Sequence, residues 1–257
     1  MNRDKLVKVF DDNANSYDKY RPKYPNEVIE ELIDLSQIKA KDKILEIGCG
    51  TGQITIDFVK RGYEVVGIEK GESLSRIASN KIEKYGIGKI INSTFEDWVT
   101  SEKFKLVIAA QAFHWIDKKR GINKILRLLK DNGSIGLIWN VDKSQETEFW
   151  EQTSKVYDKY LPKKKGQGGM EETIEEHWDY IYKRKELINF GKREYQWEKV
   201  YSKEEYLGLL NTFSPHMSME LNKRERFFKE IKSIIEGLNN RVLKNYKTVL
   251  LFANKRS

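Results

Sequence analysis

The chain has 257 residues, of which 39% are hydrophobic and 33% charged, so it can bury a sizeable core in one α/β domain with an elaboration. No run approaches the ~20 apolar residues of a membrane span, and residues 1–5 lack the apolar stretch of a signal peptide. We therefore predict a cytoplasmic protein with no membrane partner. The single cysteine, Cys49, excludes an intrachain disulfide and a thiolate metal cluster.

The net charge of +8 and the isoelectric point near 9.2 raise the question of nucleic-acid binding. Through Val141 the chain carries 24 Lys and Arg against 20 Asp and Glu, and after it 23 against 19. Dedicated nucleic-acid binders concentrate positive charge on a stripe or tail, whereas here the excess is spread evenly and the dense cluster is confined to 163–165. We therefore predict a lysine-rich surface without a specific nucleic-acid partner.

Residues 1–25 are polar, and Pro22 and Pro25 exclude a helix at the end of this segment. Before the prolines, four residues recur at helical spacing and predict a short helix. They are Phe10, Ala14, Tyr17 and Tyr20. Asn26 is then expected to cap the next helix.

From residue 43 to 141, short apolar runs alternate with helical patterns. The predicted strands are 43–47, 64–68, 89–92, 105–110 and 134–139. The predicted helices between them are 52–61, 73–85 and 117–130, the last ended by Asn132 and Gly133. Because apolar strands that alternate with helices form a parallel sheet covered on both faces, we predict a doubly wound α/β fold.

After Val141 the alternation breaks. Helices are expected at 144–161 and 171–184, separated at 162–169 by a mobile loop with three glycines and like charges. A strand is expected next at 187–197. The capping box Ser202 to Glu205 then opens a helix that runs to Leu210. A helix at 224–238 and a strand at 246–253 complete the chain. Aromatic residues in this part could line a substrate site or simply belong to the core. They are Trp150, Tyr157, Trp178, Tyr182, Tyr206 and Phe213.

The most informative stretch is the glycine-rich turn after the first strand. Gly48, Gly50 and Gly52 occupy alternate positions, where the chain must turn sharply and a ligand can lie against the backbone. Glu46 precedes the turn, and Glu69 follows 23 residues later at the end of the next strand, where an acidic residue can accept hydrogen bonds from ribose hydroxyls. The spacing G-x-G-x-G lacks the extra residue of the NAD fingerprint, and no Walker-type lysine follows.

The run Glu46 to Gly52 resembles the cofactor loop of class I S-adenosylmethionine-dependent methyltransferases. That resemblance implies a Rossmann-like sheet of seven strands, with the last antiparallel and inserted beside the sixth. It also implies that the loop packs under the methionyl part of the cofactor, with Glu69 on the ribose, and that the product is S-adenosylhomocysteine. The residues expected in cofactor binding at and after these two strands are Glu46, Gly48, Cys49, Gly50, Thr51, Gly52, Gln53, Glu69 and Lys70.

The run Phe10 to Pro25 resembles the N-terminal segment of the trans-aconitate methyltransferase-like, or type-11, branch of this family. There the segment implies a flap over the cofactor, with Tyr17 and Arg21 near its carboxylate, a group that guanidinium pairs with bidentately. The alternative is an aromatic tail packed on the core.

Ligands of open α/β sheets bind outside the carboxyl ends of the strands. After the third strand, many relatives have an Asp that contacts the adenine amine where this chain has Thr94; the hydroxyl of Thr94, the backbone of Phe95 or the carboxylate of Glu96 would then take that role. After the fourth strand, Gln111 to Asp117 resembles the branch's aromatic-His-Trp stretch beside the cofactor. The resemblance thus adds Gln111, Ala112, His114 and Trp115 to the expected cofactor contacts.

His114 is the candidate catalytic residue, because a neutral imidazole can remove a substrate proton near pH 7. The alternative is that it hydrogen-bonds the backbone or orders the cofactor site. A base is optional in methyl transfer, since holding the reactants in line supplies much of the acceleration. No metal-ligand box and no Ser/His/Asp order is present, and Cys49, inside the loop, is predicted to pack rather than react.

We predict a methyltransferase that acts on a small molecule, through a carboxylate or a hydroxyl, as a monomer or homodimer. The alternatives are an RNA methyltransferase and a non-catalytic S-adenosylmethionine-binding protein. The expected parts are an N-terminal flap at 1–25, a cofactor-binding core at 26–141, a helical lid at 142–186 and, at 187–257, the completion of the sheet with substrate-side helices.

Overall fold

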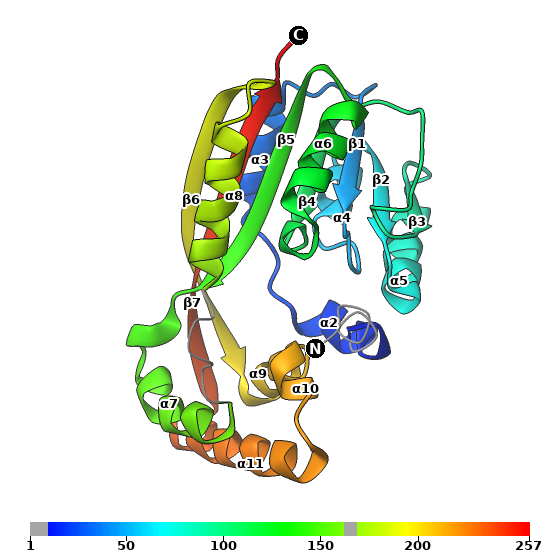
Figure 1. Ribbon diagram of the computed structural model, residues 1–257. Coiled ribbons are helices and arrows are strands. Elements are labelled where there is room, and N and C mark those ends of the chain that lie inside the picture. Colours follow the sequence, from blue (N-terminus) through cyan, green and yellow to red (C-terminus); the bar gives the residue numbers. More distant parts are fainter. Residues whose placement is uncertain (1–9, 162–168) are drawn as a thin grey trace. The chain divides into compact units, whose positions relative to one another are not determined.

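The computed structural model describes residues 10–161 and 169–257 (Figure 1). Its contacts divide the chain into two compact units. The sheet unit comprises Lys23–Asn140, Met170–Tyr195 and Thr248–Ser257, and the second unit comprises Met1–Pro22, Val141–Gly169 and Gln196–Lys247. The predicted loop at 162–169 lies, apart from Gly169, outside the described residues.

One seven-stranded sheet has the order β3-β2-β1-β4-β5-β7-β6. Its strands are β1 Lys43–Ile47, β2 Glu64–Glu69, β3 Lys89–Asn92, β4 Phe104–Ala110, β5 Leu129–Asp142, β6 Leu187–Ser202 and β7 Arg241–Lys255. The pairs of β1 with β2 and β4, of β2 with β3 and of β4 with β5 are parallel. The last strand is antiparallel and lies between β5 and β6, so the predicted fold is confirmed.

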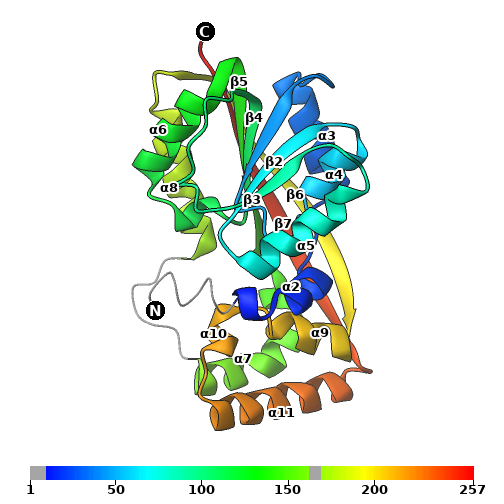
Figure 2. The same ribbon diagram turned by 90° about the vertical axis from the view of Figure 1, so that its right-hand side faces the viewer.

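Helices cover both faces of the sheet unit. Figure 2 shows α3 (Asn26–Ser36), α4 (Thr55–Lys60) and α5 (Glu72–Glu83) on one side of the strands, and α6 (Lys118–Leu128) and α8 (Met170–Tyr182) on the other. Leu32 of α3 and Phe58 of α4 are fully buried with the apolar β-branched residues of the central strands. This burial on two faces explains why β1, β2 and β4 read as continuous apolar runs.

The second unit has its own apolar cluster, built around the fully buried Phe227. It contains α2 (Ala14–Tyr20), α7 (Glu148–Tyr160), α9 (Lys203–Leu210), α10 (Ser214–Met217) and α11 (Leu221–Gly237). Tyr157 and Tyr206 belong to this cluster, and the ring of His216 stacks on Phe227 with centroids 5.1 Å apart. Their positions here favour the packing interpretation of these aromatics over the substrate interpretation.

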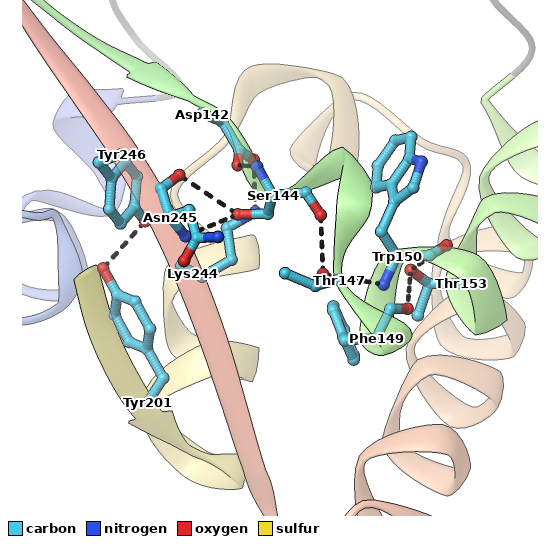
Figure 3. A network of polar contacts seen from close by, with 10 residues as sticks. All are labelled: Asp142, Ser144, Thr147, Phe149, Trp150, Thr153, Tyr201, Lys244, Asn245 and Tyr246. Carbon is cyan, nitrogen blue, oxygen red and sulfur yellow. Dashed lines mark hydrogen bonds and ion pairs between the residues drawn. The ribbon is translucent and has the colours of Figure 1, made fainter. Parts of the chain in front are cut away.

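A polar network in the second unit joins the end of β5 to β7 (Figure 3). The ammonium group of Lys244, which is 6% exposed, pairs with the Asp142 carboxylate. The backbone N–H of Asn245 donates to Ser144 Oγ at 3.0 Å, and the Thr147 hydroxyl donates to the Ser144 carbonyl at 2.7 Å and caps α7. The start of α7 is therefore attached to β7 by hydrogen bonds.

Several predicted boundaries are confirmed. The strands 43–47 and 89–92 match β1 and β3, and the capping box between Ser202 and Glu205 is present in both directions at the start of α9.

Other predicted boundaries were wrong. The helix predicted to reach Lys130 ends at Leu128, because Leu129 turns extended and pairs with Phe104 to begin β5. The helix predicted from Gly52 begins at Thr55, since Gly52 lies in the left-handed region at φ +78°.

At the N-terminal side of the sheet unit, Pro25 rather than Asn26 is the cap of α3. In the second unit, α7 is preceded by a 3-10 turn, η2 (Ser144–Glu146), and α11 begins at Leu221 because the Glu220 side chain accepts the N–H groups of residues 222 and 223. The short α10 was not predicted.

Within the described ranges, no helix combines the length and the apolar character needed to cross a membrane. The same part of the chain holds no group of three or more His, Cys, Asp and Glu side chains placed to bind a metal ion.

Candidate functional site

The glycine-rich turn lies at the carboxyl end of β1, between β2 and β4. Gly48, Gly50 and Gly52 have φ values of +66°, +57° and +78°, in the left-handed region that side chains with a Cβ disfavour. A Cβ on Gly48 would lie 2.6 Å from the Cβ of Ala112, which follows β4. The turn therefore requires glycine both for its backbone angles and for its closeness to the next strand.

Glu69, at the end of β2, connects this turn to the following one. Its two carboxylate oxygens accept the backbone N–H groups of Gly50 at 2.9 Å and Gly71 at 2.8 Å. The carbonyl of Ile68 accepts two further N–H groups, from Gly48 and Cys49. The acidic residue expected on the ribose is thus part of the framework that shapes the loop, and its contact with a ribose stays a prediction.

Glu46 lies below the turn and is 1% exposed. Burial raises the pKa of its carboxyl to about 8, and the nearby charge of Glu69 acts in the same direction. The Thr55 hydroxyl, at the first residue of α4, donates to it at 2.5 Å and lowers the pKa in part. This contact ties β1 to α4; direct contact of Glu46 with a cofactor stays a prediction.

Cys49 is buried inside the turn. Burial raises the pKa of its thiol well above the usual value, and the charge of Glu46 adds to the effect, so the thiolate is strongly disfavoured. A Cβ on Gly67 would lie 2.9 Å from its sulfur. These contacts support the interpretation of Cys49 as a packing residue.

Three buried polar atoms around the turn have no hydrogen-bond partner within residues 10–161 and 169–257. They are Thr51 Oγ1, Gln53 Nε2 and Gln111 Oε1. Buried polar groups are almost always paired in folded proteins. Thr51 and Gln53 follow β1 and Gln111 follows the adjacent β4, so all three atoms belong to segments at the carboxyl edge of the sheet, where ligands of open α/β sheets bind.

The segment after β3 already uses several of the groups proposed for adenine. The Thr94 hydroxyl donates to Asp97 at 2.6 Å and accepts the Asp97 N–H at 3.0 Å. The Lys124 ammonium donates to the carbonyls of Phe95, Glu96 and Trp98. These bonds hold the segment as a compact turn, and the adenine contact itself stays a prediction. Lys70 is exposed after β2, and its carbonyl accepts from Asn92.

Gln111 has a left-handed φ of +54°, its N–H donates to the Ile138 carbonyl and its side-chain amide donates to the Asn140 carbonyl at 2.9 Å. Ala112 then leads into η1 (Phe113–Trp115), in which Phe113 is fully buried and Trp115 is 38% exposed. The residues after β4 are therefore held against the end of β5.

Within η1, the ring of His114 is half-buried. Trp139, which is fully buried near the end of β5, donates its indole N–H to His114 Nδ1 at 3.2 Å. Burial lowers the pKa of His114 to about 4, and His177 acts in the same direction. The imidazole is thus neutral at pH 7. Trp139 was not among the predicted site residues; its position at a strand end, where ligands of this fold bind, was the available signal.

The two predicted flap residues, Tyr17 and Arg21, lie in the second unit. The Arg21 guanidinium is over the rings of Tyr17 and Phe213, at 5.0 and 4.4 Å from their centroids, and donates to the Thr212 carbonyl at 2.6 Å. These contacts fix the side chain within its own unit, and its predicted role toward a cofactor carboxylate stays a prediction.

Comparison with known proteins finds similarity to methyltransferases. Residues 44–133 match the family described as methyltransferase domain, which covers β1 to the early part of β5. An uncharacterized methyltransferase of Schizosaccharomyces pombe is 24% identical over 91% of this chain and 89% of its own length. A probable S-adenosylmethionine-dependent methyltransferase of Saccharomyces cerevisiae is 30% identical over 56% of this chain and half of its own length.

The solved structures agree on the fold. A putative type II methyltransferase of Anaeromyxobacter dehalogenans superposes with a TM-score of 0.62 over 92% of this chain and 98% of that one, at 18% identity. Together with the glycine turn at the end of β1 and the acidic residue at the end of β2, these matches lead to one conclusion. Residues 44–133 thus match a methyltransferase domain, and the chain resembles the class I S-adenosylmethionine-dependent methyltransferases.

Proposed function

We propose that the protein transfers a methyl group from S-adenosylmethionine to a small-molecule acceptor, through a carboxylate or a hydroxyl oxygen. The observation that carries the site assignment is the turn from Gly48 to Gly52, with its three glycines of positive φ. In and after it, and after the adjacent β4, lie three buried polar atoms with no partner in the described ranges. The trans-aconitate methyltransferase-like subgroup, the cytoplasmic location and the monomeric or homodimeric state belong to this proposal.

The unpaired atoms suit the amino-acid part of the cofactor. Gln111 Oε1 is an acceptor fitted to an ammonium group, whereas Gln53 Nε2 and the Thr51 hydroxyl are donors fitted to a carboxylate. Glu69 holds the turn in shape through Gly50, and an acidic residue at the end of β2 is placed where ribose hydroxyls are bound in folds of this kind. The donor set thus fits a ligand that carries both charges and a ribose.

When bound, S-adenosylmethionine supplies a methyl group on a positively charged sulfur, an electrophile that needs no further activation. The chain's contribution is then to hold and orient the two reactants, because good alignment lowers the activation barrier by about 7–11 kcal/mol. An acceptor oxygen would form the new bond to the methyl carbon with its lone pair, and the carbon–sulfur electron pair would stay on sulfur. A carboxylate releases no proton in this step, whereas a hydroxyl must lose one.

Thermal unfolding with and without S-adenosylhomocysteine tests the cofactor site. A ligand at 100 times its Kd stabilises the folded state by about 2.7 kcal/mol, so Tm should rise with S-adenosylhomocysteine and not with NAD. Gly50→Val and Glu69→Ala should abolish the rise. Gly62→Val is the matched control, because Gly62 also has a positive φ, +85°, but lies outside the turn. A rise that survives in both site variants would show that the site is elsewhere.

The acceptor is found by transfer of labelled methyl to a panel of small carboxylates and alcohols. Methyl transfer to any member supports the proposal, and the product's ester or ether linkage identifies the acceptor oxygen. Binding of the cofactor with transfer only to RNA would replace the small-molecule acceptor by the RNA alternative.

A further inference from the structure

The parallel register of β4 and β5 brings Trp139 beside the residues that follow β4. Ala110, the last residue of β4, pairs with Ile138, so the chain that leaves β4 runs beside Trp139, the next residue of β5. Trp139 is fully buried, and its indole N–H reaches His114 Nδ1 at 3.2 Å. The contact joins the predicted catalytic residue to a side chain that has no freedom to move into solvent.

This hydrogen bond can run in one direction only. An indole N–H is a donor and never an acceptor, so His114 Nδ1 must accept with its lone pair. A neutral imidazole carries a single proton, which must then be on Nε2. Nε2 is therefore a donor, and the only lone pair that could remove a proton is already used by Trp139.

The other two histidines are held in the opposite way. His177 Nδ1 lies 2.7 Å from the Thr173 carbonyl, and His216 Nδ1 lies 2.9 Å from the Leu210 carbonyl. Carbonyl oxygens only accept, so both rings carry the proton on Nδ1. All three histidines of the sequence lie in the described ranges, and His114 is the one that the fold holds with its proton on Nε2.

The indole of Trp139 is itself supported from α8. The ring of His177 packs on it with centroids 5.5 Å apart, and His177 also meets Phe113 edge-on at 5.5 Å. Because His177 is fixed by its bond to the Thr173 carbonyl, neither ring can turn without breaking a buried contact.

We propose that Trp139 is a positioning residue that holds His114 as an Nε2–H hydrogen-bond donor, so that His114 orders the methyl-transfer site and does not act as its general base. The placement of His114 in that site rests on the proposed function, whereas the direction of the hydrogen bond does not. Of the two roles open to His114 from the sequence, this selects the ordering role.

Nitrogen NMR of the protein labelled with 15N-histidine tests the proposal directly, without cofactor or acceptor. At pH 7 the His114 Nδ1 should show the shift of an unprotonated ring nitrogen and Nε2 that of a protonated one, while His177 and His216 show the reverse. His114→Gln and His177→Gln assign the signals. A protonated His114 Nδ1 in the wild-type protein would overturn the proposal.

Trp139→Phe removes the N–H while keeping an aromatic ring in the core. Because the lost donor stabilises the neutral imidazole, the pKa of His114 should rise. Trp98→Phe is the matched control, since Trp98 is also a buried tryptophan of the sheet unit but packs on Phe104. An unchanged His114 titration in Trp139→Phe, or the same change in Trp98→Phe, would remove the positioning role.

Activity on an acceptor found by the labelled-methyl assay separates donor from base. His114→Gln keeps an N–H near the Nε2 position, and His114→Phe keeps neither donor nor acceptor. A donor role predicts that the Gln variant retains more of kcat than the Phe variant and follows the wild-type pH profile. Equal loss in both variants contradicts a donor role. Absence of transfer to every acceptor contradicts the proposed function and leaves the NMR result to decide the tautomer.

Discussion

The carboxylate of Glu69 accepts the backbone N–H of Gly50 at 2.9 Å, across the ends of two adjacent strands. Through its other oxygen it also holds the turn after β2, at Gly71. A side chain expected to bind the cofactor therefore shapes the loop that would receive it, and the loss of this carboxylate should affect both the fold and the binding site.

Replacing Glu69 by Ala leaves two buried backbone donors without their acceptor. Such a loss is worth about 1–3 kcal/mol of unfolding free energy, which urea unfolding measures. Glu72→Ala is the control, because Glu72 is exposed in the first turn of α5. Equal stability of the two variants would show that the Glu69 contacts do not hold the turn.

Gly48→Ala should destabilise the protein more than Gly62→Ala. Both positions have a positive φ, which disfavours Ala by about 1–2 kcal/mol. A Cβ at position 62 meets nothing within 4 Å, whereas one at 48 meets Ala112 Cβ at 2.6 Å, which adds about 1–3 kcal/mol of overpacking. The double variant Gly48→Ala with Ala112→Gly should recover most of this second part. If the double variant is no more stable than Gly48→Ala, the clash with Ala112 is not the source of the destabilisation.

Glu46→Gln should change how stability depends on pH. Burial raises the pKa of Glu46 to about 8 in the folded state, above the ordinary value of 4.5 for a glutamate. The folded protein therefore keeps the proton while the unfolded chain loses it, and wild-type stability falls as pH rises from about 4.5 to about 8, by at most about 1.4 kcal/mol per pH unit. Gln mimics the protonated carboxyl and removes this slope. Parallel stability curves for the two proteins would refute the raised pKa.

Removing the Asp142 carboxylate should destabilise the protein more than removing the Lys244 ammonium with which it pairs. Lys244 is 6% exposed and Asp142 is half-exposed. Asp142→Asn leaves a buried ammonium without its anion and should lower the unfolding free energy by about 1–3 kcal/mol. Lys244→Met keeps the aliphatic stem and leaves the carboxylate in water, so its loss should be smaller. The reverse order in chemical unfolding would contradict this account.

Binding to transfer RNA should disappear near physiological salt. The evenly spread excess of Lys and Arg favours weak contacts to phosphates, which fall steeply as salt rises. Titration of tRNA at increasing salt measures this. Binding that persists near physiological salt would favour the RNA methyltransferase alternative.

Local patterns were sufficient for the bounds of β1 and β3 and for the turn. The apolar run 43–47, the three glycines after it and the acidic residue 23 positions after Glu46 are all short-range signals, and the structure brings these residues together. The capping box at Ser202 is equally local.

Contacts between residues far apart in the chain could not be predicted from local sequence patterns. The start of β5 at Leu129 depends on its pairing with Phe104, 25 residues earlier in the chain, which overrides a helical pattern that continues past Leu128. The bond between Trp139 and His114 likewise depends on the register of β4 and β5. Neither partner's neighbours in sequence indicate that the two side chains meet.

The contact between Gly48 and Ala112 also has a meaning for how the chain can diverge. A residue larger than Ala at 112 would clash with the glycine turn. A residue with a Cβ at 48 would clash with the segment that follows β4. The residue type at each position therefore limits the size of the residue at the other. We expect the two positions to covary among descendants of this sequence: a change at one should be inherited together with a smaller residue at the other, although 64 positions of sequence separate them.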